Sequence, residues 1–436
     1  MKRSYLFLIM WTLLLFAFSS IGYAQNDPMR PEMKALGSVD LSKYFTHEDN
    51  LKVLGDYAYV LGSVIDEHRS ETGSGKVRDI SSVLVVVNIR DKENPKAEST
   101  LAFDKTERVS DYALNGKYVY CLIRKEKEPM KLAIIDAGNP KELKILNSDL
   151  VLSAKSGNII INANKLFIIS RIRGILDESS ISSYDLSDPL QPKVIHSTFI
   201  DGANKKEYPY FNGSVHKIYV DQDFLYVVTD NNILTFRDDG DNIYLTAKTD
   251  IQFENDPLIS FSDLAPGMDK NVLGYVFLAG SNNLYLEKPK ENADGTRYTD
   301  LESGVATYAI MNYESNSINL DMLKSLEIPV IPFDVSTDKN IVRIYGPKLD
   351  MSSDALCVVD FRKPQEPQII GTYDTDYIGF LIQVVNNTGY TIKNGKFSIF
   401  DVPSGGTGFE SIWQKVSNPE KSGEYIKQTV VERKGK

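Results

Sequence analysis

Seven polar residues precede seven similar aromatic segments of this chain and could supply ligand-binding or acid–base chemistry. They are Asn50, Asp111, Asn158, Lys217, Ser262, Asp334 and Gln383. Their mixed donors and acceptors could together hold a small polar ligand, an ion or a peptide end. The carboxylates of Asp111 and Asp334 could instead serve a hydrolase, lyase or lactonase as acid and base. We expect these residues to line a central channel of the fold. Polar residues that only line a water-filled channel, without binding a ligand, would show the same pattern.

Three arginines form a second candidate site. Arg124, Arg171 and Arg173 follow the second strand expected in two successive repeats. Guanidinium groups offered by neighbouring repeats would suit a carboxylate or phosphate, because the fork of N–H donors matches two oxygen acceptors. An ordinary solvated rim explains the same residues, so both interpretations stay open.

Metal and cofactor motifs are weak in this sequence. The chain has four scattered histidines, His47, His68, His196 and His216, and the sequence predicts no metal site from them. Residues 238–242 (Asp-Asp-Gly-Asp-Asn) lack the spacing of a calcium loop and predict a hairpin turn. Residues 73–76 (Gly-Ser-Gly-Lys) lack the first glycine of a phosphate loop, and Val77 stands where Ser or Thr would bind magnesium. We therefore predict no catalytic residue, metal or cofactor.

An internal repeat indicates which elements position these residues. A turn residue followed by an aromatic and aliphatic run recurs roughly every 45–70 residues. The copies begin near residues 55, 115, 164, 222, 274, 340 and 388. Most are followed by a second apolar run that ends in Asp or Asn and then by a proline, as in residues 85–88 and 95. The fourth and fifth copies lack this ending.

The repeat predicts an all-β fold, a seven-bladed β-propeller with four-stranded antiparallel blades. The runs are short, rich in Val, Ile, Tyr and Phe, and bounded by Gly, Asn, Asp and Pro, as strands are. One blade alone would expose two apolar faces, so a closed ring is needed. The segment 31–40 resembles an outer strand and is expected to complete the last blade. The expected blades span residues 50–104, 109–147, 156–200, 214–251, 260–327, 332–374 and 377–403.

These repeats resemble the LVIVD repeat, because an aromatic strand is followed by an aliphatic run ending in Asp and then by Asp/Asn-Pro. The similarity covers about residues 31–403 and is best in blades one, two, three and six. The resemblance implies a propeller of the kind found in exported bacterial and archaeal proteins. It implies no defined activity, since propellers carry unrelated functions.

Long insertions share one position in the repeat. Each lies between the second and third strands of a blade: residues 62–80, 124–130, 171–180, 280–303 and 346–355. Hairpins within a blade alternate between its two ends, so all five should emerge on one face. Insertions gathered on one face of a repeat protein often mark its binding face, although tolerated surface loops would have the same distribution.

The N-terminus predicts export. A basic start, an apolar run over residues 5–18 and small residues before position 25 predict a signal peptide over residues 1–24. An uncleaved anchor helix is the alternative. The mature chain is expected in the periplasm, at the cell surface or outside the cell, and not integral to the membrane. The polar tail 404–436 includes a short apolar segment, residues 409–413, that predicts a brief helix.

The charge and the cysteine content of the chain limit the classes of partner that we expect. A net charge of −10 argues against nucleic acid. Only two cysteines are present, Cys121 and Cys357, and their apolar surroundings predict buried thiols without a disulfide framework. The preferred hypothesis is a monomeric, non-enzymatic binding module for a protein or glycan of the cell envelope, with no cofactor. The alternative is the channel hydrolase, lyase or lactonase described above.

Overall fold

The computed structural model of the protein consists of β-strands joined by turns and loops wherever its residues are described. The described residues are 33, 35–69, 76–125, 128–152, 156–172, 178–199, 215–221, 223–229, 232–250, 255–262, 272–281, 290–291, 297–298, 303–313, 317–338, 341–349, 353–375, 381–385 and 387–402. They belong to the unit Met33–Lys436. The expected signal peptide, the tail 404–436, where the sequence predicts a short helix, and Arg173 lie outside them.

The described strands form seven four-stranded antiparallel sheets, which we number as blades in chain order. Blade one consists of β2 (His47–Leu54), β3 (Tyr57–Arg69), β4 (Lys76–Asn88) and β5 (Lys96–Ala102). Blade two consists of β6 (Glu107–Asn115), β7 (Tyr118–Lys125), β8 (Lys131–Asp136) and β9 (Lys144–Val151). Blade three consists of β10 (Ser156–Asn162), β11 (Lys165–Ile172), β12 (Glu178–Asp185) and β13 (Lys193–Phe199).

The remaining blades follow the same order from the inner to the outer strand. Blade four consists of β14 (Val215–Asp221), β15 (Phe224–Thr229), β16 (Asn232–Asp238) and β17 (Ile243–Asp250). Blade five consists of β18 (Asn255–Ser262), β19 (Val272–Ser281), β22 (Ser303–Tyr313) and β23 (Ser317–Glu327), and a small hairpin of β20 (Lys290–Glu291) and β21 (Arg297–Tyr298) is inserted in it. Blade six consists of β24 (Asp334–Asp338), β25 (Ile341–Pro347), β26 (Asp354–Asp360) and β27 (Gln368–Thr375). Blade seven consists of β28 (Leu381–Val385), β29 (Thr388–Lys393), β30 (Lys396–Asp401) and β1 (Ala35–Asp40).

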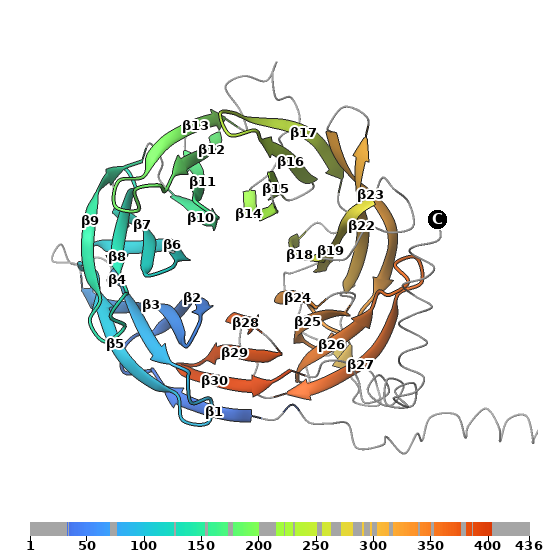
Figure 1. The fold of residues 1–436 in the computed structure, drawn as a ribbon. Helices are drawn as coiled ribbons and strands as arrows, with labels where there is room; N and C mark the ends of the chain where they lie inside the picture. The colour runs from blue at the N-terminus through green and yellow to red at the C-terminus, as the bar shows by residue number, and fades with distance from the viewer. Residues whose placement is uncertain are drawn as a thin grey trace, which may run out of the picture. The chain divides into compact units, whose positions relative to one another are not determined.

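The blades are arranged around a central axis (Figure 1). Contacts connect each blade to the next and the last blade to the first, through β4–β6, β6–β10, β10–β14, β17–β23, β18–β24, β24–β28 and β28–β2. The innermost strands β2, β6, β10, β14, β18, β24 and β28 surround the central opening. The prediction of an all-β propeller with four-stranded antiparallel blades is confirmed.

The N-terminal strand closes the ring by adding to the last blade. β1 pairs antiparallel with β30, and this register joins Ser38 to Ser398 and Asp40 to Lys396. Gly37 on β1 lies against the backbone carbonyls of Lys92 and Glu93 in blade one, so there is no space for a larger side chain. The chain therefore connects its first described strand to its last by strand pairing, as the sequence predicted for residues 31–40.

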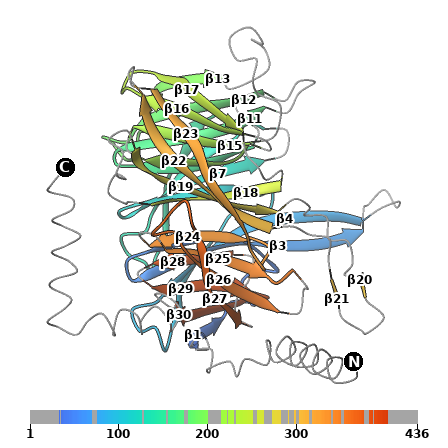
Figure 2. The same ribbon diagram turned by 90° about the vertical axis from the view of Figure 1, so that its right-hand side faces the viewer.

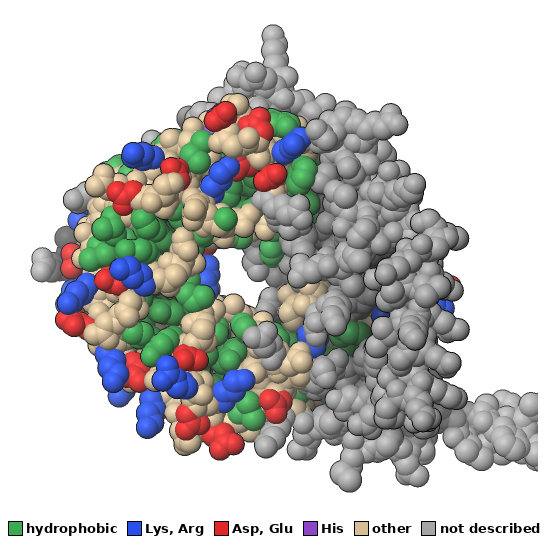
Figure 3. Space-filling model, in the orientation of Figure 1, with side chains coloured by type: hydrophobic (Ala, Val, Ile, Leu, Met, Phe, Trp, Pro, Cys, Tyr) green, Lys and Arg blue, Asp and Glu red, His purple; other side chains and the backbone are tan. Residues whose placement is uncertain are grey.

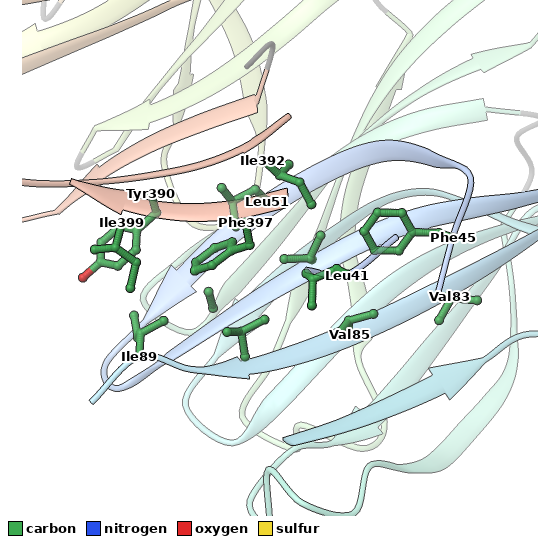
Figure 4. Close-up of a cluster of buried hydrophobic side chains, with 13 residues drawn as sticks. Leu41, Phe45, Leu51, Val83, Val85, Ile89, Tyr390, Ile392, Phe397 and Ile399 are labelled. Atoms are coloured by element: carbon green, nitrogen blue, oxygen red, sulfur yellow. The ribbon is translucent and has the colours of Figure 1, made fainter. Parts of the chain in front are cut away.

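Apolar side chains between adjacent blades form the core. In the cluster between blades one and seven, Phe397 and Ile399 of β30 and Val85 of β4 are fully buried (Figure 4). Removing one such side chain from water contributes roughly 1.5–3 kcal/mol. The described clusters lie between blades seven and one, one and two, two and three, three and four, five and six, and six and seven. Packing on both faces of a blade explains why its strands are apolar without clear alternation.

The polar residue that ends the third strand of most blades caps the following loop. The side-chain Oδ1 of Asp136 accepts a hydrogen bond from the amide of Gly138 (2.8 Å), and that of Asp185 accepts one from Ser187 (2.9 Å). The same bond forms at Asn88 and Asp360. Asx residues favour this two-residue turn because their short side chain reaches a nearby amide. The repeated Asp or Asn is therefore structural.

Blade four makes the turn differently, with an Asp-rich segment that begins at Asp238, the last residue of β16. Asp238 accepts from the amide of Gly240 at 2.9 Å, and Asp239 accepts from the amides of Asp241 and Asn242. Gly240 has a φ of 104°, a conformation that glycine adopts easily. The predicted hairpin turn at residues 238–242 is confirmed.

Candidate functional site

Five of the seven polar residues predicted for the channel occupy one register position on the inner strands. Their partners on the second strands are Leu61 for Asn50, Leu122 for Asp111, Ile169 for Asn158, Val228 for Lys217 and Tyr345 for Asp334. Each lies four residues before the last paired residue of its inner strand, next to the turn that leads to the second strand. In blades one, two and four the residue follows a β-bulge.

The other two residues are offset from this position, which corrects the sequence alignment. Ser262 is the last residue of β18 and pairs with Tyr275, so Leu258 occupies the shared position in blade five. Gln383 lies two residues further along β28, where it pairs with Tyr390, and Leu381 occupies the position. In blade five the alignment failed because nine residues separate β18 from β19, so the spacing to the following aromatic segment does not locate the shared position.

Asp111 links three blades through its carboxylate. Oδ1 accepts from the side-chain amide of Asn50 in blade one at 2.9 Å and from its own neighbour, the amide of Tyr112, at 2.8 Å. Oδ2 accepts from the backbone amide of Ile159 in blade three at 3.0 Å. Asp111 is 8% exposed. Its acceptor sites are therefore directed at protein donors, and leaving those donors unpaired in a buried place would be costly.

Two further residues, which the sequence did not indicate, complete the group. The ammonium of Lys52 lies 3.6 Å from Oδ1 of Asp111, donates to the carbonyl of Tyr112 and sits 5.0 Å from the centre of that ring. The hydroxyl of Tyr112 donates to the carbonyl of Tyr59 at 2.5 Å. Burial, followed by the charge of Asp111, holds the pKa of Tyr112 well above its usual value. Tyr112 therefore acts as a neutral donor.

Similar bonds join blade seven to its neighbours. Oε1 of Gln383 accepts from the backbone amide of Val53 in blade one at 2.5 Å. The guanidinium of Arg343, 2% exposed, donates to Oδ1 of Asn387 at 3.1 Å between blades six and seven. Three residues predicted as ligand-binding, Asn50, Asp111 and Gln383, thus tie blades together.

The two carboxylates of the alternative, enzymatic hypothesis lie in blades that are not adjacent. Asp111 lies in blade two and Asp334 in blade six, and these blades are not neighbours in the ring. Paired-carboxylate hydrolysis needs separations of roughly 5–10 Å. In the part of the chain that the structure describes, no three His, Cys, Asp or Glu residues are grouped as metal ligands would be. Of Lys217, Ser262 and Asp334 only the backbone is described.

Both cysteines are buried and unpaired. Burial raises the pKa of Cys357 to about 12 and raises that of Cys121 further. A thiol that stays protonated is a poor nucleophile. The cysteines therefore serve as apolar core residues, as their sequence surroundings predicted.

The insertions emerge at one end of the blades, which we call the insertion end. All lie between the second and third strands, and β3, β4 and the hairpin β20–β21 project on the same side of the ring (Figure 2). Blade one differs from the prediction, because most of residues 62–80 extend the strands into a long hairpin in which Ile65 pairs with Ile80.

Among the described residues, no helix has the length and apolar character needed to span a membrane.

The opposite end of the ring carries the capped loops. On the face seen in Figure 3, the described Lys and Arg side chains are interspersed with Asp and Glu and with hydrophobic residues. Many of the charges are paired, for example Arg90 with Asp56 at 3.0 Å and Arg362 with Asp360. This face shows no large area of one charge in its described part.

Two of the three arginines predicted as a second site, Arg124 and Arg171, lie at the insertion end, and Arg173 is outside the described residues. Arg124 is two residues beyond Leu122, and Arg171 is two residues beyond Ile169, so both hold the same register position in adjacent blades. Arg124 is exposed and pairs across the hairpin with Arg108. The sequence did not single out Arg108, because a bulge between Val109 and Asp111 shifts the pairing by one residue.

Structural comparison supports the fold. The chain is similar to the WD40 domain of Pan2 from Neurospora crassa, with a TM-score of 0.51 and 7% identity over 86% of this chain and 96% of that one. It is also similar to Drosophila semaphorin 2a, with a TM-score of 0.50 and 7% identity over 86% of this chain and 76% of that one. No family model and no curated protein matches the sequence. At such low identity these similarities establish the propeller fold alone.

Proposed function

We propose that this chain is an exported LVIVD-type propeller that works as a binding module of the cell envelope, with the insertion end as its binding surface. The observation that carries the proposal is the division of the molecule into two ends. Five of the seven blades vary the connection at the insertion end, whereas the other end repeats one capped loop in blades one, two, three and six. Variable connections on a rigid scaffold are where binding residues concentrate.

The interior supports binding at the surface over chemistry in the channel. Asn50, Asp111 and Gln383 bond to adjacent blades, so these side chains hold the ring together. A closed ring of seven four-stranded sheets gives the protruding hairpins a fixed base. The partner in this proposal is a protein or glycan of the envelope, and the propeller acts as a monomer.

Replacing residues 282–302, which include β20 and β21, by a short Gly-Ser linker tests this proposal. We expect partners crosslinked to the intact protein in cell envelopes to be lost from the variant while its thermal unfolding is unchanged. Lys141→Ala, in a capped loop at the other end, is the matched control and should retain every partner. Unchanged partners in the linker variant would contradict the proposal.

Export is tested separately by sequencing the N-terminus of the mature protein. The proposal expects a chain that starts near Gln25 and is recovered from the periplasm, the cell surface or the medium. A chain that keeps residues 5–18 and remains in the membrane fraction would favour the anchored alternative. A full-length chain in the cytoplasm would contradict export.

A further inference from the structure

Two arginines face each other directly across the hairpin of β6 and β7 at the insertion end. The register pairs Arg108 with Arg124, and the next pair toward the strand ends is Glu107 with Lys125. The Glu–Lys pair follows the usual preference for opposite charges across strands. The Arg–Arg pair breaks it, since like charges directly opposite each other destabilise a sheet.

The surroundings only partly balance these charges. The guanidinium of Arg108 lies 3.8 Å from Oδ1 of Asp49 in blade one, and its side chain remains 41% exposed. Lys125 is paired with Glu128 at 3.1 Å, so that carboxylate is already engaged. Within the described part of the chain, the exposed side chain of Arg124 has no ion pair. Two arginines thus hold directly opposite register positions, and the described residues provide one carboxylate, Asp49, which pairs with Arg108.

Blade three places another arginine at the corresponding height. Arg171 has the register position of Arg124, and its partner Ser156 begins the inner strand β10. β10 contacts both β6 and β7 of blade two. The backbone therefore brings three arginine positions to the same end of two adjacent blades.

We infer that Arg108 and Arg124 form a carboxylate-binding site for an acidic polypeptide segment of the partner. The inference rests on the proposed function and specifies the chemistry of that surface. Two adjacent guanidinium forks can each bind a carboxylate through two parallel N–H···O bonds. A run of Asp or Glu residues would also relieve the repulsion between the arginines. The whole chain carries a net charge of −10, so a local pair of positive charges would favour one orientation of an acidic partner.

The direct test measures binding of a fluorescent peptide that contains six consecutive glutamates, with the glutamine peptide as the reference. We expect salt-sensitive binding of the glutamate peptide to the full chain and none of the glutamine peptide. Arg124→Gln and Arg108→Gln should each weaken binding about tenfold, since one lost charge-assisted interaction of about 1.4 kcal/mol corresponds to tenfold. Arg124→Lys should recover only part of the affinity, because an ammonium lacks the planar fork.

A stability measurement separates a binding role from a structural one. Arg124→Gln removes a like-charge pair, so its melting temperature should stay the same or rise by about 1 °C while binding falls. Arg362→Gln at the capped-loop end is the matched control and should bind the peptide like the parent. A loss of stability in Arg124→Gln that parallels the loss of binding would overturn the inference.

Other outcomes are equally decisive. Equal peptide binding by the parent and Arg124→Gln would refute the site, and so would full competition by an equimolar amount of inorganic phosphate, which would assign it to phosphate. If the envelope partner is lost on replacing residues 282–302 but peptide binding ignores Arg124, the proposed function stands and this inference fails. If peptide binding depends on Arg124 but the envelope partner is still crosslinked after residues 282–302 are replaced, the arginine site stands and the proposed function fails.

Discussion

Two polar residues three positions apart on β6 have opposite surroundings. Asp111, on the inner wall, receives hydrogen bonds from blades one, two and three. Arg108, at the insertion end, faces another arginine and is 41% exposed. The sequence indicated Asp111 as a site residue and did not indicate Arg108. The comparison teaches that charge and spacing do not identify a site, because what matters is whether neighbouring blades already use the side chain.

Asp111→Ala should have the largest effect on stability. The substitution leaves the side-chain amide of Asn50 and the amide of Ile159 without their acceptor and Lys52 without its carboxylate. Removing one partner of such a buried group costs about 3–5 kcal/mol. Urea unfolding of the purified protein measures this loss. Glu107→Gln on the same strand, at the insertion end, is the control and should cost little. Equal losses for both would remove the distinction between the two regions.

Gly37→Val should destabilise the closure of the ring by about 2 kcal/mol, because overpacking of a filled space costs about 1–3 kcal/mol. The added side chain would collide with the carbonyls of Lys92 and Glu93. Hydrogen exchange should show faster opening of β1 and β30, and thermal unfolding should begin earlier. Ser38→Ala, at the next and exposed position, should change neither. If Gly37→Val unfolds like the parent, β1 does not close the ring as described.

Asp238→Ala should cost about 2 kcal/mol, since Asp238 is 6% exposed and combines a charged pair with a turn. Its carboxylate lies 2.7 Å from the ammonium of Lys165 in blade three and caps the amide of Gly240. Denaturant titration measures the loss, and Asp241→Ala in the same turn, which is exposed, is the reference. A cost no larger than that of the reference would show that the blade three to blade four tie is unimportant.

Ala163→Gly is expected to act in the opposite direction and stabilise the protein by about 1 kcal/mol. Ala163 has a φ of 50° in the turn of blade three, where blades one and two have Gly55 and Gly116 with φ of 58° and 57°. A side chain in this left-handed region costs about 1–2 kcal/mol, of which part is offset by the greater freedom of glycine when unfolded. A raised denaturation midpoint is the expected result. Lower stability would mean that the turn tolerates alanine without strain.

The smallest expected effect is on the stability of the protein at acidic pH, through the carboxyl of Asp185. The hydroxyl and then the amide of Ser187 donate to Asp185 and hold the pKa of that carboxyl below its usual value. The folded state therefore binds this proton less readily than the unfolded chain. The contribution to stability is present above the unfolded pKa of about 3.9 and is lost as pH falls through the lower folded value. NMR titration should give a higher pKa for Asp185 in Ser187→Ala, with Asp91 unchanged as the internal control.

Local patterns in the sequence determined the strands, the blade type and the turn at residues 238–242. Short β-branched and aromatic runs bounded by Gly, Asn, Asp and Pro suffice for these elements, because each depends on residues near in sequence. The closing strand was also predictable, since residues 31–40 look like the outer strands of the other blades. The buried cysteines followed from the apolar runs around Cys121 and Cys357.

Only the tertiary structure decided which polar residues remain available for binding. The acceptors of Asp111 and Gln383 are filled by amides from other blades, and hydrogen bonds between blades leave no periodic trace in one sequence. Ser262 is the last residue of β18 and so lies beyond the shared register position. A bulge in β6 set Arg108 opposite Arg124, since one extra residue changes every later pairing. The sequence determined which elements form because that depends on local preference, whereas the use of each polar group depends on neighbours that the folded ring brings together.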